Sequence, residues 1–141
     1  MTRKYLLPAL ASFSIFTAPF SAYADSGNCR LDLYEISYVD SQMGQIIQQT
    51  KIETKNISVE VPADADAYWT YNLTGSIGDF KIIAQVDNAE KSISSVQILD
   101  QDHAVEFNNR DTVMSFSNFK TNRSVGVFCS FVIKKNPLIF S

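Results

Sequence analysis

Alternation of apolar and polar residues is the dominant pattern along the chain. In four segments every second side chain is hydrophobic and mostly polar side chains lie between: 57–61, 67–73, 80–86 and 125–133. A period of two places one face of a β-strand on a core and the other face in water. These four segments are therefore predicted to be half-buried strands.

Shorter or less regular runs fill the gaps between these segments. With Asp and Asn residues supplying turns between them, five further strands are predicted: 30–39, 45–54, 92–99, 103–107 and 112–119. In the first of these the apolar phase slips between Leu33 and Tyr34, and a β-bulge would explain the slip.

Residues 41–50 form the one segment where a helix competes with a strand. Met43, Ile46 and Ile47 would share a helical face, but Gly44 and the β-branched content disfavour a helix, so a strand is predicted. Eight or nine short strands without βαβ units predict an all-β fold. The expected architecture is an antiparallel β-sandwich, with a small β-barrel as the alternative.

The first 24 residues have the order of a secretory signal. Arg3 and Lys4 precede an apolar run to about Phe20, and the small-residue site Ala22-Tyr23-Ala24 follows. This run is shorter than the ~20 residues that span a bilayer, so a membrane anchor is disfavoured. We expect residues 1–24 to be cleaved and residues 25–141 to form one domain, in the periplasm or outside a bacterial cell.

The charge of the chain excludes one class of function and favours one kind of partner. The sequence has 12 basic and 15 acidic residues, and losing Arg3 and Lys4 with the signal leaves 10 against 15, or −5. Binding to nucleic acid needs a basic face, so it is not expected. An acidic domain favours a basic partner, although acidity also serves solubility.

The two cysteines are predicted to form a structural disulfide. Cys29 lies on the apolar stripe of Leu31, and Cys129 lies on that of Val127 and Phe131, so both sulfurs should point inward. Exported proteins pair their thiols. A redox pair or a metal site would need a C-x-x-C motif or further ligands, which are missing. The bridge would join the first strand to the last.

His103, the only histidine, is the one candidate for catalysis. Asp100, Asp102 and Glu106 lie within three residues of it, so a catalytic or metal site of histidine and carboxylate is one interpretation. A solvated turn would gather the same residues. Because no motif places a nucleophile, a small hydrolase using His103 is the third-ranked function.

Calcium is the metal to consider, because two pairs of aspartates are each separated by one residue. Asp64 and Asp66 form one pair and Asp100 and Asp102 the other. Neither pair continues with the Gly and oxygen ligands of an EF-hand loop. No metal or cofactor is therefore expected, although distant loops of a sandwich could still assemble a calcium site.

The densest aromatic cluster offers a candidate binding surface. Alternation places Trp69 and Tyr71 in the core with Leu73, and turns Tyr68 outward with Asn72 on its face. An exposed aromatic ring beside an amide suits a glycan or a protein partner. Tyr68, Asn72 and His103 are therefore the candidate binding residues.

These observations favour a non-enzymatic binding module, acting as an inhibitor, an immunity-type protein or an adhesion protein toward a protein or glycan. The alternative is a structural subunit of a surface fibre or pilus, since exported disulfide-bonded β-domains suit that role. Strand donation is disfavoured at both ends, because few residues precede Cys29 and Pro137 interrupts the C-terminal segment.

Overall fold

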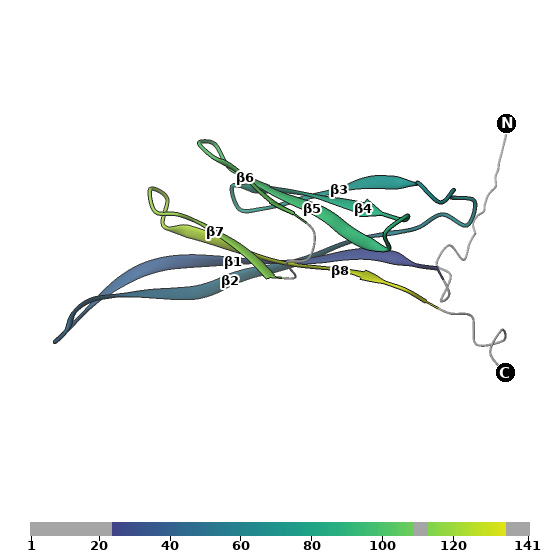
Figure 1. Ribbon diagram of the computed structural model, residues 1–141. Helices are drawn as coiled ribbons and strands as arrows, with labels where there is room; N and C mark the ends of the chain where they lie inside the picture. The colour runs from purple at the N-terminus through teal and green to yellow at the C-terminus, as the bar shows by residue number, and fades with distance from the viewer. Residues whose placement is uncertain (1–23, 109–112, 135–141) are drawn as a thin grey trace, which may run out of the picture.

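The computed structural model describes residues 24–108 and 113–134. Within these ranges the chain forms eight strands and no helix. The expected signal segment lies outside them except for Ala24. The strands form two four-stranded antiparallel sheets that lie one above the other as two layers (Figure 1). The predicted all-β sandwich is therefore confirmed.

Each sheet combines strands in a defined order. In the first sheet the order is β2 (Gly44–Glu60), β1 (Ser26–Ser41), β8 (Arg123–Val132) and β7 (Val113–Asn118). In the second sheet the order is β3 (Thr70–Ile77), β4 (Phe80–Asp87), β5 (Ser92–Leu99) and β6 (Ala104–Asn108).

The strand predictions hold with one merger and one offset, because the strand predicted over 67–73 begins only at Thr70 and runs to Ile77. The expected strands 45–54 and 57–61 are parts of the single long strand β2, which gives eight strands. Residues 44–50 are strand, so the helical alternative is excluded there. The β1–β2 register does shift between Leu33 and Tyr34, but the extra residue is Ile52 of β2, and β1 pairs with β8 without interruption, so the bulge lies in β2 and not in 30–39 as predicted.

The core lies between the two sheets and is built from the inward residues of the alternating stripes. Leu31, Val127, Ile82 and Ile98 are completely buried. Each comes from a different strand, two from each sheet, because alternation aims every second side chain at the facing layer. The hydrophobic effect of this burial is what holds the two layers together.

Cys29 and Cys129 form the predicted disulfide. They lie directly opposite each other on β1 and β8, both nearly fully buried, with an S–S distance of 2.08 Å. The bridge thus joins the first strand to the last within one sheet. A buried structural disulfide indicates an oxidising compartment.

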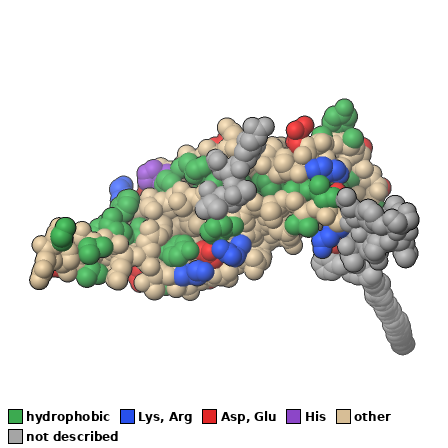
Figure 2. Space-filling view, turned by 60° about the horizontal axis from the view of Figure 1, so that its bottom comes forward, with side chains coloured by type: hydrophobic (Ala, Val, Ile, Leu, Met, Phe, Trp, Pro, Cys, Tyr) green, Lys and Arg blue, Asp and Glu red, His purple; other side chains and the backbone are tan. Residues whose placement is uncertain are grey.

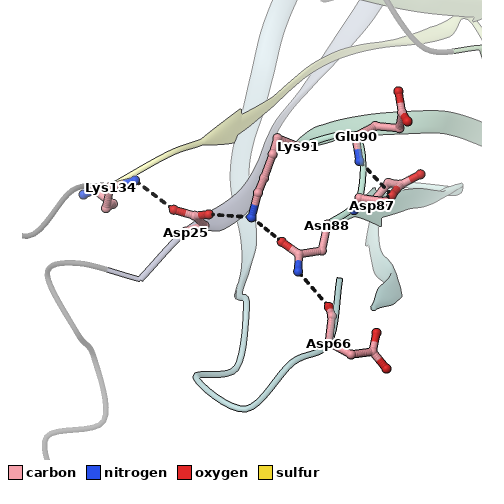
Figure 3. Close-up of polar contacts among 8 residues, drawn as sticks. Asp25, Asp66, Asp87, Asn88, Glu90, Lys91 and Lys134 are labelled. Atoms are coloured by element: carbon pink, nitrogen blue, oxygen red, sulfur yellow. Dashed lines mark hydrogen bonds and ion pairs between the residues drawn. The ribbon is translucent and has the colours of Figure 1, made fainter. Parts of the chain in front are cut away.

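At one end of the sandwich, which we call the closed end, polar contacts link both sheets (Figure 3). Asp25 pairs with Lys91 Nζ at 3.1 Å and accepts the backbone N–H of Lys134 at 3.0 Å. Lys91 also donates to the side chain of Asn88 at 2.6 Å, and Asn88 donates to the carbonyl of Asp66 at 2.9 Å. The start of β1, the end of β8 and the β4–β5 turn are therefore joined.

Candidate functional site

At the other end of the molecule, β1 and β2 continue beyond the two-layered body as a two-stranded projection (Figure 1). Strand β8 accompanies β1 only to the pair Glu35–Arg123. One more hydrogen bond follows, from the N–H of Ile36 to the carbonyl of Asn122 at 2.8 Å. We call residues 37–50 the arm, because in the described part of the chain β1 and β2 pair there only with each other.

Both faces of the arm carry exposed apolar side chains. Tyr38 lies opposite Ile47 and Val39 lies opposite Ile46, and residues directly opposite share a face. These four side chains are 42–52% exposed, and Met43 at the tip is 96% exposed. Figure 2 shows hydrophobic side chains gathered at this narrow end of the molecule. A single layer has no second sheet to cover either face.

The tip of the arm is a closed turn rather than a loose loop. The Ser41 hydroxyl donates to the carbonyl of Gly44 at 2.7 Å and accepts the N–H of Met43 at 3.2 Å. Gly44 has φ of 110°, a conformation that a side chain would disfavour. Met43 is therefore presented on an ordered support.

Asp40 is the only charged residue of the arm. Its carboxylate accepts a long hydrogen bond of 3.5 Å from Gln45, its cross-strand neighbour. Natural edge strands are commonly protected from pairing by charges or proline. The arm has little such protection.

Sequence reasoning did not identify the arm as a surface, because it treated 30–39 and 45–54 as half-buried strands. A signal was present in two adjacent apolar pairs, Tyr38-Val39 and Ile46-Ile47. Consecutive apolar residues in a strand point to opposite faces. A strand with adjacent apolar residues therefore carries hydrophobic side chains on both faces, and any face that no other layer covers is exposed.

His103 lies in the β5–β6 turn, where the turn itself uses the nearby carboxylate. Asp100 Oδ1 accepts the backbone N–H groups of Asp102 at 2.8 Å and His103 at 2.7 Å, and lies 3.2 Å from His103 Nδ1. Asp100 Oδ2 accepts from Asn118 at 2.7 Å. The half-exposed His103 ring also packs on Phe116, with 5.5 Å between centroids.

These contacts explain the acidity of Asp100. Burial by itself would raise the pKa of this carboxyl group. The hydrogen bonds from the Asp102 backbone, from Asn118 and from His103 outweigh it and lower the pKa below its ordinary value of 3.8. The carboxylate therefore acts as the centre that holds the turn in shape.

The two aspartate pairs considered for calcium are not brought together. Asp66 Oδ1 accepts the N–H of Tyr68 at 2.8 Å, and its carbonyl accepts from Asn88 at the closed end of the sandwich. Asp100 and Asp102 instead lie beside Asp79 and Asn118 around a small hollow. Ligand atoms of Asp100, Asp102 and His103 lie within 4.8 Å of one another, but the hydrogen bonds above already engage Asp100.

The residues predicted around the aromatic cluster have different outcomes. Tyr68 lies in the turn before β3 and is 81% exposed, and Asn72 is exposed on β3. The predicted core position of Tyr71 is wrong: it is 46% exposed, because β3 is a sheet edge and its ring stacks on Trp69 at 5.8 Å. Leu73 is buried as expected. Arg110 and Asp111, which follow the His103 cluster, lie outside the described residues.

An acidic residue is unexpectedly buried on the outer face of the first sheet. Asp32 is completely buried, although it points away from the sandwich core. It accepts from Thr54 at 2.8 Å and pairs with Arg30 at 3.3 Å and Lys51 at 3.8 Å, while Arg30 stacks over Phe128 at 4.4 Å. Arg30 and Lys51 thus balance the charge of the buried carboxylate.

Comparison of the chain with models of protein families, with curated proteins and with solved structures finds no match. Nowhere in residues 24–108 and 113–134 is there a helix long and apolar enough to cross a membrane.

Proposed function

We propose that the protein is an exported, non-enzymatic binding module that holds a protein partner through its arm, in the periplasm or outside the cell. The observation that carries the proposal is the arm itself. It is an ordered projection with apolar residues on both faces and at its tip, and each of these side chains is at least 42% exposed.

The physics of the arm indicates the kind of partner. Burying one Leu-, Ile- or Met-sized side chain contributes about 1.5–3 kcal/mol, and the arm offers Tyr38, Val39, Met43, Ile46 and Ile47. A flat surface would cover only one face. A partner that encloses the arm in an apolar cleft would cover both, and inhibitor, immunity-type and adhesion roles all accommodate that arrangement.

The other candidates draw less support. Aliphatic side chains give a glycan few hydrogen bonds, so a glycan is better served by exposed Tyr68 and Asn72. A hydrolase using His103 would need its neighbouring carboxylate for chemistry, but Asp100 is engaged by the turn. A fibre subunit would use the open strand edges of the arm rather than its faces.

The test compares what three purified baits capture from an envelope extract. The arm variant is Tyr38→Ser/Met43→Ser, and the control is Tyr68→Ser, which removes an even more exposed aromatic ring from the body, 81% exposed against 47% for Tyr38. We expect one set of proteins to be captured by wild type and control and lost by the arm variant. Capture of the same proteins by the arm variant would refute the proposal.

Melting temperatures keep this test interpretable. Exposed substitutions of this kind usually change stability by no more than about 0.5 kcal/mol. All three baits should therefore unfold at nearly the same temperature, and the loss of capture would then reflect the lost surface rather than a lost fold.

A further inference from the structure

The backbone of the arm shows which groups of β2 are free to pair. The N–H of Ile36 points away from β2, because it donates to the carbonyl of Asn122. Its partner Gln49 must therefore also turn its backbone groups away from β1, as in every non-hydrogen-bonded antiparallel pair. Since direction alternates along a strand, Gln45, Ile47 and Gln49 present free N–H and C=O groups at the outer edge.

This edge has the composition of a pairing strand. β2 is the outermost strand of its sheet, and residues 44–50 are all exposed. The segment Gln45–Thr50 contains two isoleucines and no charge or proline. Uncharged β-prone edges of this kind pair readily with another strand.

We propose that the occupant of this edge is a second copy of the chain, joined antiparallel about a two-fold axis through Ile47. Gln45 of each copy then lies opposite Gln49 of the other, and Ile47 lies opposite Ile47. In each of these pairs, both residues point their backbone N–H and C=O groups toward the other copy. Each pair can therefore form two backbone hydrogen bonds. The two arms become one four-stranded sheet.

The side chains favour a second copy over an unrelated strand, because the edge is complementary to itself. The axis through Ile47 creates a continuous apolar row, Tyr38–Ile47–Ile47–Tyr38, on one face. No two charges of like sign face each other along the paired segment. The nearest charge on the strand, Lys51, lies opposite Met43 of the other copy's tip.

Neighbouring registers are poorer by the same criteria. An axis through Ile46 would place Gln49 against Met43 in the turn of the other copy. An axis through Gln48 would place Ile47 opposite Gln49 and Gln45 opposite Lys51. Only with the axis through Ile47 do Gln45, Ile47 and Gln49 of one copy all lie opposite residues of the same set in the other copy.

This inference does not depend on the proposed function. Pairing uses the edge of β2, whereas the partner proposed above would cover the faces of the arm. A sheet of two arms still exposes both faces, so the second copy and the partner occupy different surfaces.

The test places charges at the two residues that the axis brings together. In Gln45→Lys/Gln49→Lys, lysines from the two copies face each other twice. In Gln45→Lys/Gln49→Glu, each lysine faces a glutamate. Sedimentation of the purified, oxidised proteins over a range of concentrations measures their association. We expect dimers for wild type and for the Lys/Glu variant, and a dimer dissociation constant raised about tenfold or more for the Lys/Lys variant.

A single Gln49→Lys variant is the matched control. Gln49 accepts a hydrogen bond from Ser124 at 3.0 Å, and this variant loses that contact without placing like charges opposite each other. It should remain dimeric. Wild type that is monomeric at every concentration, a Lys/Lys variant that stays dimeric, or open polymers in place of dimers would each overturn the proposal.

The partner-capture test separates the two proposals. None of these variants alters the apolar residues of the arm, so capture of the partner should survive in all of them. If the Lys/Lys variant loses the dimer but keeps capture, the result supports the pairing proposal independently of the partner proposal. If Tyr38→Ser/Met43→Ser loses capture but remains dimeric, the apolar residues of the arm are needed for the partner and not for pairing.

Discussion

The body and the arm are made from the same kind of strand but have different surroundings. Ile82 and Ile98 in the body are completely buried, whereas Ile46 and Ile47 in the arm are each 52% exposed. The difference comes from the second layer, which covers the first sheet along the body and is missing beyond Ile36. A period of two identifies a strand, but it does not identify what covers the strand.

The two ends of the molecule differ in the same way. At the closed end, Asp25, Lys91 and Asn88 join both sheets by hydrogen bonds and an ion pair. At the arm, the strand pairing of the described chain runs only between β1 and β2, with one side-chain hydrogen bond from Ser124 to Gln49 at its base. An isolated two-stranded hairpin is at best marginally stable in water, so the arm depends on the body that anchors it and on whatever covers its surface.

The largest effect should come from removing the disulfide, which belongs to the body alone. The bond between Cys29 and Cys129 spans 100 residues of sequence. In the chain-entropy model a loop of this size restricts the unfolded chain by about 4.7 kcal/mol, a large part of the 5–15 kcal/mol typical of a domain. Cys129→Ser should strongly lower the melting temperature measured by calorimetry.

The double variant Cys29→Ala/Cys129→Ala sharpens this prediction. It also opens the loop but leaves no polar hydroxyl beside buried Val127, so it should lose somewhat less stability than Cys129→Ser. Unchanged stability after reduction would show that the bridge does not support the body.

A matched pair of truncations tests the comparison directly. Ile82→Ala removes a buried side chain and should cost about 2–5 kcal/mol. Ile46→Ala removes the same atoms from an exposed position and should stay within about 0.5 kcal/mol for the isolated monomer. Chemical denaturation of both variants gives the two values, and similar values would mean that the arm is covered in solution.

The sequence predicted the body better than the arm for a physical reason. The disulfide follows from local pattern and compartment and is present, whereas the bulge predicted near Leu33 and Tyr34 lies in the partner strand β2. Tyr71 follows the same alternation, but its exposure depends on β3 being a sheet edge. The arm likewise depends on where β8 stops, which is a property of strand pairing and not of the residues in the arm.

The β5–β6 turn, which Asp100 holds in shape, gives a smaller, pH-dependent effect. Because the pKa of Asp100 is lowered in the folded state, its carboxylate stabilises the protein above its ordinary pKa, and that contribution is lost as the pH falls through the lowered value. Asp100→Asn should therefore be less stable than wild type at neutral pH. The difference in melting temperature should narrow as the pH falls below about 3.8.

His103→Ala is the control for this prediction. It removes the exposed ring on the same turn but keeps the Asp100 carboxylate and its contacts with Asn118 and the backbone N–H groups. Its melting temperature should stay near that of wild type at neutral pH. A constant difference between Asp100→Asn and wild type at all pH values would show that the carboxylate charge is not the stabilising feature.

The smallest effect should be that of salt on partner binding. Salt should change the association rate, which depends on the charged body, more than the dissociation rate, which depends on the apolar arm. The expected −5 charge of residues 25–141 acts at long range and steers a basic partner, so the association rate should fall as salt shortens the Debye length to about 8 Å. The arm carries only Asp40, so apolar contacts there should leave the dissociation rate nearly constant. Surface plasmon resonance of a captured partner at several salt concentrations measures both rates. A dissociation rate that rises as steeply as the association rate falls would place the contact on the charged body instead of the arm.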